Sequence, residues 1–514
     1  LPSLYLFPRG DNFDEIRLYE RYNTNYGYME QYWPYGDASL SLQNPYWIQN
    51  RINRTSNKKR YMMNASLKWQ ATDWLNVVGR VNLDNSDYRN KNEKSASTLT
   101  TFCGVSGGFE DAMRQERSLY ADFLANIDKT FGDFHLTANV GASIYHTSMD
   151  QLYIAGDLVI PNFFQINNIN FSANYKPDPT GYEDEIQSIF ASAELSWKNQ
   201  LYLTVTGRND WDSKLAFSKQ KSFFYPSVGL SALLSEMVKL PEVISYAKIR
   251  GSYTVVASSF DRFLTNPGYE YNSQTHNWAN PTVYPMDNMK PEKTKSWEIG
   301  LNLKFWGNRF NLDATYYRSN TLNQTFKVDI PSSSGYKQAI VQAGDVQNQG
   351  IELALGFSDK WAGFGWSSNA TFTLNRNKVK RLASGSVNPV TGEAIQMDEM
   401  NVGWLGKENV APRVILTEGG SMTDIYVYNQ LTKDNNGNIK VDQNGNLGIT
   451  SSNTPVKVGN LDADFNLGWT NHFTYKGIDL GVVLSARVGG LAYSATQGIL
   501  DYYGVSDPAF YHCR

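Results

Sequence analysis

The stretch TKSWEIGLNLKFWGNRFNLDATYYRSN (residues 294–320) decides the fold, because apolar residues occupy every second position on both sides of a Gly-Asn turn. Successive side chains of a β-strand point to opposite faces, so this pattern predicts a β-hairpin with one apolar face. Ile299 and Leu303 would share that face, while Glu298 and Asn302 would share the opposite one. The apolar face could lie against a protein core or against lipid.

The same period-two pattern recurs along the chain and answers that question. About fourteen segments pair into hairpins: 61–70 with 73–88, 118–128 with 133–145, 187–197 with 201–211, 222–233 with 246–256, 295–305 with 310–319, 349–358 with 364–375, and 464–473 with 478–487. Links within the hairpins are short and links between them are long, as in outer-membrane barrels. The segments also exceed the roughly 5–6 residues of an ordinary soluble strand.

Aromatic residues lie at both ends of the opening hairpin, where the girdles of a membrane barrel belong. Phe305, Trp306 and Phe310 flank its short turn, while Trp297 and Tyr316 flank the long links. We therefore predict an all-β protein, a transmembrane antiparallel β-barrel with the Ile299 face toward lipid. A half-buried sheet of a soluble protein is the alternative.

Composition excludes several other classes. The 514 residues carry a net charge of −3, without the clustered basic excess of a nucleic-acid-binding protein. The sequence contains no run of about 18 apolar residues, so it predicts no transmembrane helix. A mean hydropathy of −0.46 still suits a barrel, because only one face of each strand meets lipid. Cys103 and Cys513 lie too far apart in sequence to imply a disulfide framework or a zinc site.

Signals for catalysis are weak. Residues 104–108 (GVSGG) fit the G-x-S-x-G pattern, which needs a buried strand before it and a helix after it, but a polar run precedes it here. The five histidines show no metal-ligand spacing, and no P-loop or H-E-x-x-H motif is present. We predict that the protein is not an enzyme and holds no catalytic residue and no metal.

Two long links are dense in aromatic residues, at 22–47 and 257–294. Aromatic faces offer apolar area that stacks on sugar rings or peptide side chains at a small entropic cost. The candidate substrate-binding residues are Tyr32, Trp33, Tyr35, Tyr269, Tyr271, Trp278 and Trp404. Aromatic packing that only caps the barrel is the alternative.

The link after residue 375 contains DNNGN (434–438) and DQNGN (442–446), which we interpret as turns because Asn-Gly supplies positive φ. A helix-loop-helix calcium site fails on register, since Ile439 stands where that loop needs glycine. We expect no cofactor, with a looser calcium site in residues 434–446 as the alternative.

Specific words in the sequence resemble one family. The run MKPEKTKSWEIGLNLKFWGNRFNLDATYYRSNTLNQ (289–324) is similar to the most recognisable stretch of SusC-like (RagA-like) TonB-dependent outer-membrane transporters of Bacteroidota. NPYW (44–47), LTVTGRNDWDSKL (203–215), AGDVQNQGIEL (343–353) and VGNLDADFNLGW (458–469) agree in order. The resemblance covers nearly the whole chain. Residues 255–259 (VVASS) depart from the glycine-containing ending of the family.

The resemblance implies a 22-strand barrel in the cell outer membrane that contains an N-terminal plug. It further implies a SusD-like surface lipoprotein as lid, an oligosaccharide or peptide cargo, and energy from the TonB complex acting on an N-terminal box. Outer-membrane lipid would be the remaining partner, with no nucleic acid.

Compared with the parts that the family implies, we expect residues 1–514 to be a segment of the receptor barrel. The plug, the TonB box, the carboxypeptidase-like extension and the final strands are not recognisable in them, which suggests a fragment. The predicted function is outer-membrane import of glycan or peptide fragments. A passive porin-type barrel and a surface β-rich adhesin are the alternatives.

Overall fold

The structure is a computed structural model. It describes residues 2–8, 10–36, 40–171, 177–265, 268–272, 277–285, 289–383, 387, 392–394, 397, 399–406, 411–445, 447–503 and 505.

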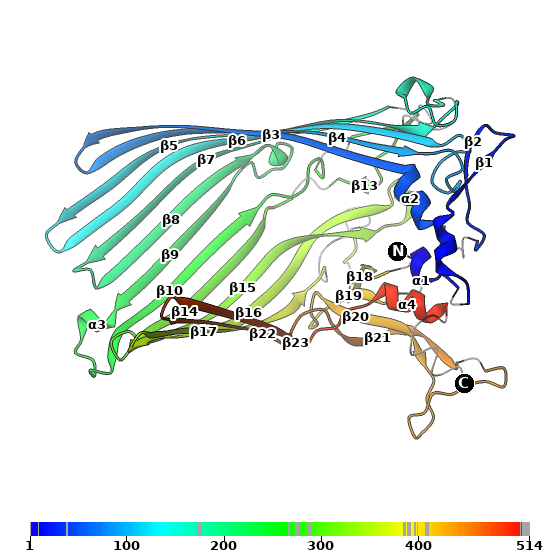
Figure 1. The fold of residues 1–514 in the computed structure, drawn as a ribbon. Helices are drawn as coiled ribbons and strands as arrows, with labels where there is room; N and C mark the ends of the chain where they lie inside the picture. The colour runs from blue at the N-terminus through cyan, green and yellow to red at the C-terminus, as the bar shows by residue number, and fades with distance from the viewer. Residues whose placement is uncertain are drawn as a thin grey trace.

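One large sheet of fifteen strands dominates the fold (Figure 1). Fourteen of them follow one another as antiparallel neighbours, and the short β13 (Val283–Tyr284) pairs in parallel with β16. The fourteen are β3 (Ile52–Thr72), β4 (Leu75–Lys94), β5 (Gly108–Phe131), β6 (Phe134–Asp157), β7 (Asp178–Trp197), β8 (Leu201–Asp212), β9 (Phe223–Leu233), β10 (Ile244–Ser258), β14 (Glu292–Phe305), β15 (Phe310–Asp329), β16 (Gln338–Trp361), β17 (Phe364–Arg381), β22 (Phe465–Tyr475) and β23 (Ile478–Val488).

The predicted hairpins are confirmed, since each one coincides with a pair of these strands. Several strands continue further toward the long links than the alternation predicted, and β16 begins at Gln338 where the prediction began at 349. Beyond the lipid both faces of a strand meet water or protein. The apolar and polar alternation therefore fades there, although the hydrogen-bonded ladder continues.

The short turns have the local chemistry that a tight reversal requires. In the opening hairpin Phe305 pairs with Phe310, and the turn between them places Gly307 at φ +66° and Asn308 at φ +70°. Glycine and asparagine tolerate this left-handed region better than other residues. The longer link between β9 and β10 contains the helix α3 (Leu234–Met237).

The remaining elements lie before β3, in the long links and after β23, at the right-hand end of the molecule in Figure 1. These are α1 (Pro2–Tyr5), η1 (Phe13–Arg17), β1 (Glu20–Asn23), β2 (Tyr28–Gln31), α2 (Pro45–Arg51), η2 (Ile166–Asn168), η3 (Ser213–Leu215), β11 (Glu270–Asn272), β12 (Asn277–Ala279), η4 (Ser332–Ser334), β18 (Glu399–Trp404), β19 (Arg413–Thr417), β20 (Asp424–Leu431), β21 (Ile449–Asn460) and α4 (Ala495–Tyr502).

The link between β17 and β22 differs from the prediction, which treated it as one connection with turns. It folds into a separate four-stranded sheet in the order β18–β19–β20–β21, which we call the external sheet. Its strands have between 5 and 12 residues, and its buried Leu416 packs against residues of the barrel strands, such as Val379. Contacts of that kind leave no periodic signal in the local sequence.

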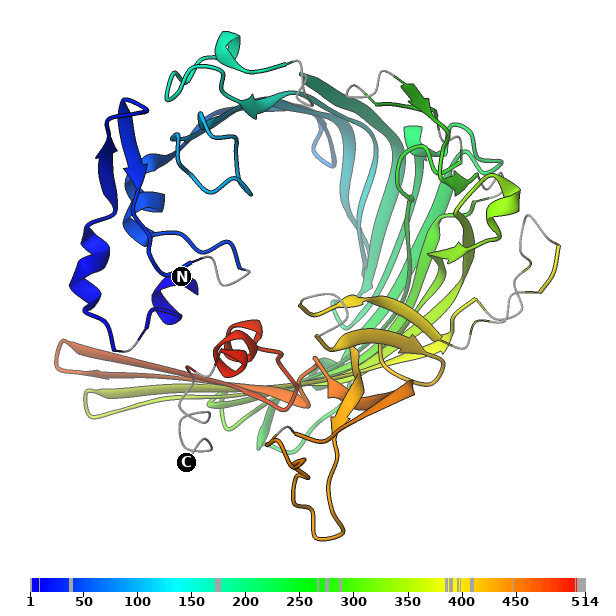
Figure 2. The same ribbon diagram turned by 90° about the vertical axis from the view of Figure 1, so that its right-hand side faces the viewer.

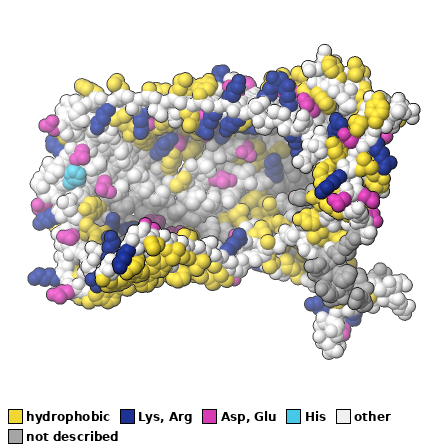
Figure 3. All heavy atoms as spheres, viewed as in Figure 1, with side chains coloured by type: hydrophobic (Ala, Val, Ile, Leu, Met, Phe, Trp, Pro, Cys, Tyr) yellow, Lys and Arg dark blue, Asp and Glu magenta, His cyan; other side chains and the backbone are white. Residues whose placement is uncertain are grey.

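The main sheet curves into a hollow, incomplete ring whose two edges are β3 and β23 (Figure 2). The N-terminal residues lie at the external mouth, beside the opening between these edges. Figure 3 looks through that opening, and charged side chains are visible inside while hydrophobic ones gather on the outer surface.

The outward face of the strands is apolar and exposed, as expected for a wall in lipid. Leu67 is 78% exposed, Leu355 56% and Ile299 54%. Aromatic rings form a girdle at the short-turn end, where successive ring centroids lie 5.3 Å (Trp306–Phe310), 4.6 Å (Phe310–Phe357) and 4.8 Å (Phe357–Trp366) apart. At the other end Trp297 and Tyr316 lie 5.4 Å apart.

Buried apolar clusters lie at the end of the barrel that carries the long links, which we call the external end. One joins Phe326 and Val346 of the strands to Leu416 of the external sheet. A second surrounds Met289, and a third surrounds Phe109. The membrane wall therefore depends on its ladder of hydrogen bonds, whereas the external end is held by packing.

The two faces of the wall predict opposite responses to a new charge. We expect Leu301→Arg to destabilise the folded barrel by about 2–4 kcal/mol, because its side chain shares the lipid face with Ile299. The measurement is a reversible unfolding titration of the complete protein in lipid.

Thr373→Arg is the matched control. Thr373 is exposed on the lumen side, opposite Glu352 of β16, and its neighbour Phe372 lies in the same register row as Leu301. We expect a change of under about 1 kcal/mol there. Equal destabilisation by both substitutions would contradict the assignment of the faces.

Candidate ligand-binding lumen and external mouth

The lumen wall is lined by paired charges and amides. On one side Arg250 of β10 contacts Asp313 of β15 at 3.1 Å and donates to the Thr315 hydroxyl at 2.6 Å. Asn302 also donates to Asp313, at 3.0 Å. A Cβ added at Gly300 would lie 2.6 Å from Cζ of Arg250, so glycine is needed where this side chain crosses β14.

A second network lines the lumen on strands β4, β5, β7 and β8. Arg80 of β4 contacts Asp122 of β5 at 2.7 Å, and the Asp122 side chain is completely buried. Arg208 donates to Asp210 at 2.7 Å and to the Ser188 hydroxyl at 2.8 Å. These pairs balance charge between strands or within one strand, so the middle of the wall offers polar groups without a strong net field.

Nearer the mouth, the inner side of β3–β7 holds a cavity of about 370 Å³, which we call the lumen recess. Its lining includes Lys58, Arg60, Asp84, Ser86, Tyr88, Glu116, Ser118, Thr147 and Tyr182. Two rings carry cations, with Lys58 Nζ 4.8 Å from the centroid of Tyr88 and Arg262 Cζ 3.5 Å from that of Tyr182. Aromatic faces beside charged groups suit a polar ligand that also has apolar faces.

The loop after β10 forms a second cavity, of about 450 Å³, lined by Arg262, Phe263, Leu264, Gly268, Tyr269, Pro281, Thr282 and Val283. We call it the loop recess. Arg262 is common to both sites, because its guanidinium stacks on Tyr182 in the lumen recess and lines the loop recess. Asp184 accepts from Arg262 Nε at 2.7 Å, and these hydrogen bonds raise the pKa of Arg262.

The predicted aromatic residues fall into three groups. Tyr269 lines the loop recess, and nearby in sequence Tyr271 and Trp278 face each other across the β11–β12 hairpin with centroids 5.1 Å apart. All three are at least half exposed. Of the predicted candidates, these have the most exposed side chains.

The second group lies in the N-terminal segment and is half-buried. Trp33 donates from Nε1 to the Gly36 carbonyl at 2.7 Å and meets Tyr35 edge-on at 5.1 Å. Tyr35 in turn packs on Phe7 at 4.8 Å, and Arg21 covers the ring of Tyr32. Most of this aromatic area is used within the segment itself.

Helix α2 holds that segment on the barrel. Asn44 caps the helix by accepting from the Tyr46 amide at 2.9 Å. Trp47 is completely buried and donates from its indole N–H to the Thr98 hydroxyl at 3.1 Å. The N-terminal residues are therefore fixed to the loop between β4 and β5.

Trp404 forms the third group, in β18 of the external sheet. The guanidinium of Arg413 lies 3.4 Å from its ring centroid and 4.7 Å from that of Tyr428. This packing occupies one face of Trp404. The structure thus brings the predicted residues together within each group, but no described contact joins the three groups.

Tyr88 and Tyr182 were missed by sequence analysis, which looked for aromatic residues in the long links. Both lie in regular strands, in β4 and β7. Their positions on the inward face of each strand, counted from the apolar residues, are the signal that could have identified them.

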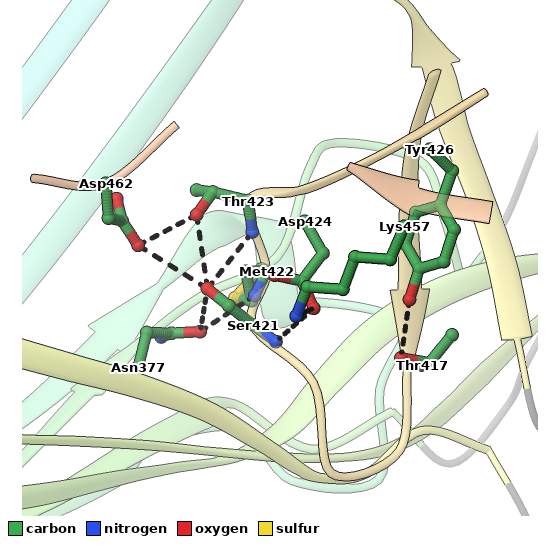
Figure 4. A network of polar contacts seen from close by, with 9 residues as sticks. All are labelled: Asn377, Thr417, Ser421, Met422, Thr423, Asp424, Tyr426, Lys457 and Asp462. Atoms are coloured by element: carbon green, nitrogen blue, oxygen red, sulfur yellow. Dashed lines mark hydrogen bonds and ion pairs between the residues drawn. The ribbon is translucent and has the colours of Figure 1, made fainter. Parts of the chain in front are cut away.

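A polar network fastens the external sheet to the barrel (Figure 4). The Asp424 side chain is completely buried, and it accepts from Lys457 Nζ at 2.6 Å and from the Ser421 amide at 2.9 Å. Nearby, the Met422 amide donates to Asn377 Oδ1 of β17 at 2.8 Å. The contact with Asn377 joins the start of β20 directly to the barrel wall.

The G-x-S-x-G match lies in the loop before β5, and its last glycine, Gly108, is the first residue of that strand. A strand therefore follows the match, where a nucleophile elbow needs a helix. Cys103 in the same loop is buried, and burial raises the pKa of its thiol to about 11. Cys103 is therefore a poor nucleophile at neutral pH. Cys513 lies outside the described residues.

The predicted turn at 434–438 is confirmed. The Gly437 amide donates to the Asp434 carbonyl at 3.0 Å, and the Asp434 carboxylate accepts from the Asn436 and Asn438 amides, both at 2.8 Å. Hydrogen bonds from Asn438 lower the pKa of Asp434. Among the described residues no group of three or more His, Cys, Asp or Glu side chains is arranged to hold a metal ion. A calcium ion at 434–446 stays an untested alternative.

Among the helices that the structure describes, none combines the length and apolar composition of a membrane span.

Known proteins that resemble this chain are β-barrels as well. The family described as TonB dependent receptor-like, beta-barrel, matches residues 5–406. TonB-dependent receptor P3 of Formosa agariphila is 23% identical over 426 residues, covering 77% of this chain and 41% of that protein. TonB-dependent receptor SusC of Bacteroides thetaiotaomicron is 25% identical over 325 residues, covering 60% and 31% respectively.

Among solved structures, one described as the RagAB peptide importer in the "open-open" state superimposes with a TM-score of 0.70 at 15% identity. The likeness covers 87% of this chain and 48% of the matched chain. It supports the barrel architecture and the order of the strands. The chain spans less than half the length of these relatives.

The ion pair between the buried Asp424 carboxylate and the half-exposed Lys457 ammonium predicts how firmly the external sheet is attached. We expect Lys457→Met to cost about 3–5 kcal/mol locally, because it leaves the buried Asp424 carboxylate without its cation. The measurement is amide hydrogen exchange of residues 413–460 in the purified protein. Lys440→Met is the control, since it removes the same charge from an exposed position. Indistinguishable exchange in the two variants would refute the role of the pair.

Proposed function

Because the chain belongs to the TonB-dependent receptor β-barrel family, we propose that it forms part of the wall of a transporter that imports glycan or peptide fragments. Barrels of this family are outer-membrane proteins, and this chain is one of them. The observation that carries the proposal is the contrast between the two faces of one continuous sheet. Its exposed outer face is apolar, whereas its inner face holds ion pairs, amides and the lumen recess.

The proposal extends to a larger barrel than the described sheet. In lipid, each unpaired backbone group of an edge strand costs several kcal/mol, so the edges of β3 and β23 need partners. We propose that further strands of a longer protein pair with them, together with a plug and a TonB box. The limited share of each relative that the chain covers supports this view.

Membership of the family also suggests the energy source of import and the protein partners. We propose that the TonB complex drives import and that a SusD-like lipoprotein covers the external mouth. The relative named SusC supports this assignment. The solved RagAB structure is described as a peptide importer, which keeps peptides beside oligosaccharides as candidate cargo. Import of this kind breaks no bond in the cargo, so we propose no enzymatic activity.

We propose that the first contacts with cargo are made where the two recesses share Arg262. Tyr88 and Tyr182 present rings on the lumen side, and Tyr269 presents one on the loop side. Tyr271 and Trp278 add exposed rings in the same external loop. We therefore favour the more exposed Tyr269, Tyr271 and Trp278 over the packed candidates Tyr32, Trp33, Tyr35 and Trp404 as ligand contacts.

Uptake by intact cells of the native host tests energy coupling. We expect accumulation of a fluorescent peptide digest or of labelled oligosaccharides to stop when the proton gradient is dissipated by an uncoupler. A passive porin would continue to equilibrate the same probes, and a surface adhesin would bind them without accumulation. Either result would contradict the proposed import.

A pair of substitutions tests the recess itself. We expect Tyr88→Ala combined with Tyr182→Ala to raise the half-saturating concentration of the transported probe about tenfold, since each lost aromatic contact contributes roughly 0.5–1.5 kcal/mol. Tyr61→Ala is the control, because Tyr61 is on the opposite, outer face of β3. An unchanged half-saturating concentration in the double variant would place the contacts elsewhere.

A further inference from the structure

A group of basic side chains lies on the outer face of β14–β17, just beyond the apolar belt. It consists of Lys293 and Lys295 of β14, Arg318 of β15, and Arg376 and Lys378 of β17. We call it the basic patch. The lumen networks and the loops described above do not include these residues.

The register of the strands places the patch on one face. Lys295 pairs with Asn320, Asn320 with Gln347, and Gln347 with Lys378, so one row crosses four strands. The next row toward the membrane runs from Trp297 through Arg318 and Gln349 to Arg376. These positions have the same parity as Ile299, and therefore share its outward direction.

The charges of the patch are largely uncompensated. Within the described part of the chain, Lys293, Lys295, Arg318 and Lys378 have no side-chain hydrogen bond or ion pair. Arg376 lies 3.9 Å from Asp464. The carboxylate within the patch is Asp345, which accepts from Asn320 at 2.9 Å. On the lumen side, by contrast, Arg80, Arg208 and Arg250 each have a carboxylate partner.

The height of the patch identifies the kind of ligand. The ring of Trp297 lies in the same row as Arg318 and Arg376, and the next row toward the membrane holds Tyr316 beside the exposed Ile299 and Ile351. Aromatic side chains of a membrane barrel mark the boundary between hydrocarbon and headgroups. Cations directly beyond that boundary are at the depth of the outer-leaflet headgroups.

We propose that the basic patch binds the phosphate-bearing headgroup of an anionic outer-leaflet lipid, whose acyl chains lie along the apolar face that includes Ile299 and Leu355. Lysine supplies mobile cations and arginine supplies a planar fork for phosphate oxygens. Between the cations, the buried Gln347 amide donates to Gln349 at 2.9 Å and the Asn320 amide donates to Asp345, so these amides hold the rows in place. This assignment rests on the fold and its membrane location, and is independent of the proposed cargo.

The competing explanation is that these side chains extend into water from the edge of the membrane without binding a particular lipid. An acidic surface of another protein would also satisfy the charge. A bound lipid differs from both, because it needs the cations and the apolar belt at the same time.

The test uses the complete protein purified from membranes and reconstituted in nanodiscs that contain phosphatidylcholine with a minority of phosphatidylglycerol. Native mass spectrometry then counts the phosphatidylglycerol molecules that stay bound after release. The variant is Lys295→Gln, Arg318→Gln and Lys378→Gln together. Each basic side chain near an anionic surface contributes roughly a fivefold factor, so we expect retention weaker by about a hundredfold.

Two matched proteins keep the result interpretable. Lys239→Gln, Lys433→Gln and Lys440→Gln together remove the same charge at exposed positions outside the barrel strands, and should retain phosphatidylglycerol like the unmodified protein. Lys295→Arg with Lys378→Arg preserves the charge and should also retain it. Far-ultraviolet circular dichroism confirms that each variant keeps its β-structure.

Three outcomes would overturn the proposal. Equal retention by the triple variant and its control would show that the patch is not the site. Equal retention of phosphatidylcholine and phosphatidylglycerol would show that charge is not recognised. Displacement of the bound lipid by millimolar inorganic phosphate would show a site for a free anion, without a contribution from the acyl chains.

Discussion

Every backbone amide and carbonyl within lipid has to find its hydrogen-bond partner in the protein, and the rest of this structure depends on that requirement. The antiparallel ladder from β3 to β23 meets it for each strand that has two neighbours. Because the ladder does not require a hydrophobic core, the lumen can stay hollow and polar. Apolar packing is concentrated instead at the external end, where the loops and the external sheet fold against one another.

Much of the wall could be predicted from the sequence. A strand with lipid on one side and water on the other has to alternate, and the residues around Ile299 and Glu298 show this directly. The prediction fell short where that physical contrast ends. Gln338, at the start of β16, lies beyond the lipid, and the external sheet buries Leu416 through contacts with distant strands.

The candidate site was only partly predictable, for a related reason. An aromatic residue in a loop indicates neither its neighbours nor its free face, so Tyr269 and Trp404 looked equivalent in the sequence. In the structure Tyr269 opens into a recess while Arg413 covers Trp404. Tyr88 and Tyr182 belong to the lumen recess through the register of β4 and β7, which requires three-dimensional pairing to recognise.

If the proposed import takes place, the pairing of Arg80 with Asp122, and of Arg250 with Asp313, also shapes the energy profile along the lumen. A cargo molecule that moves past fixed, mutually neutralised dipoles exchanges its bonds to water for bonds of similar strength to the wall. No single step then creates a deep electrostatic well, since the net field of each pair falls off quickly with distance. A passage of this kind favours entry without trapping, because binding has to be weak enough for release on the far side.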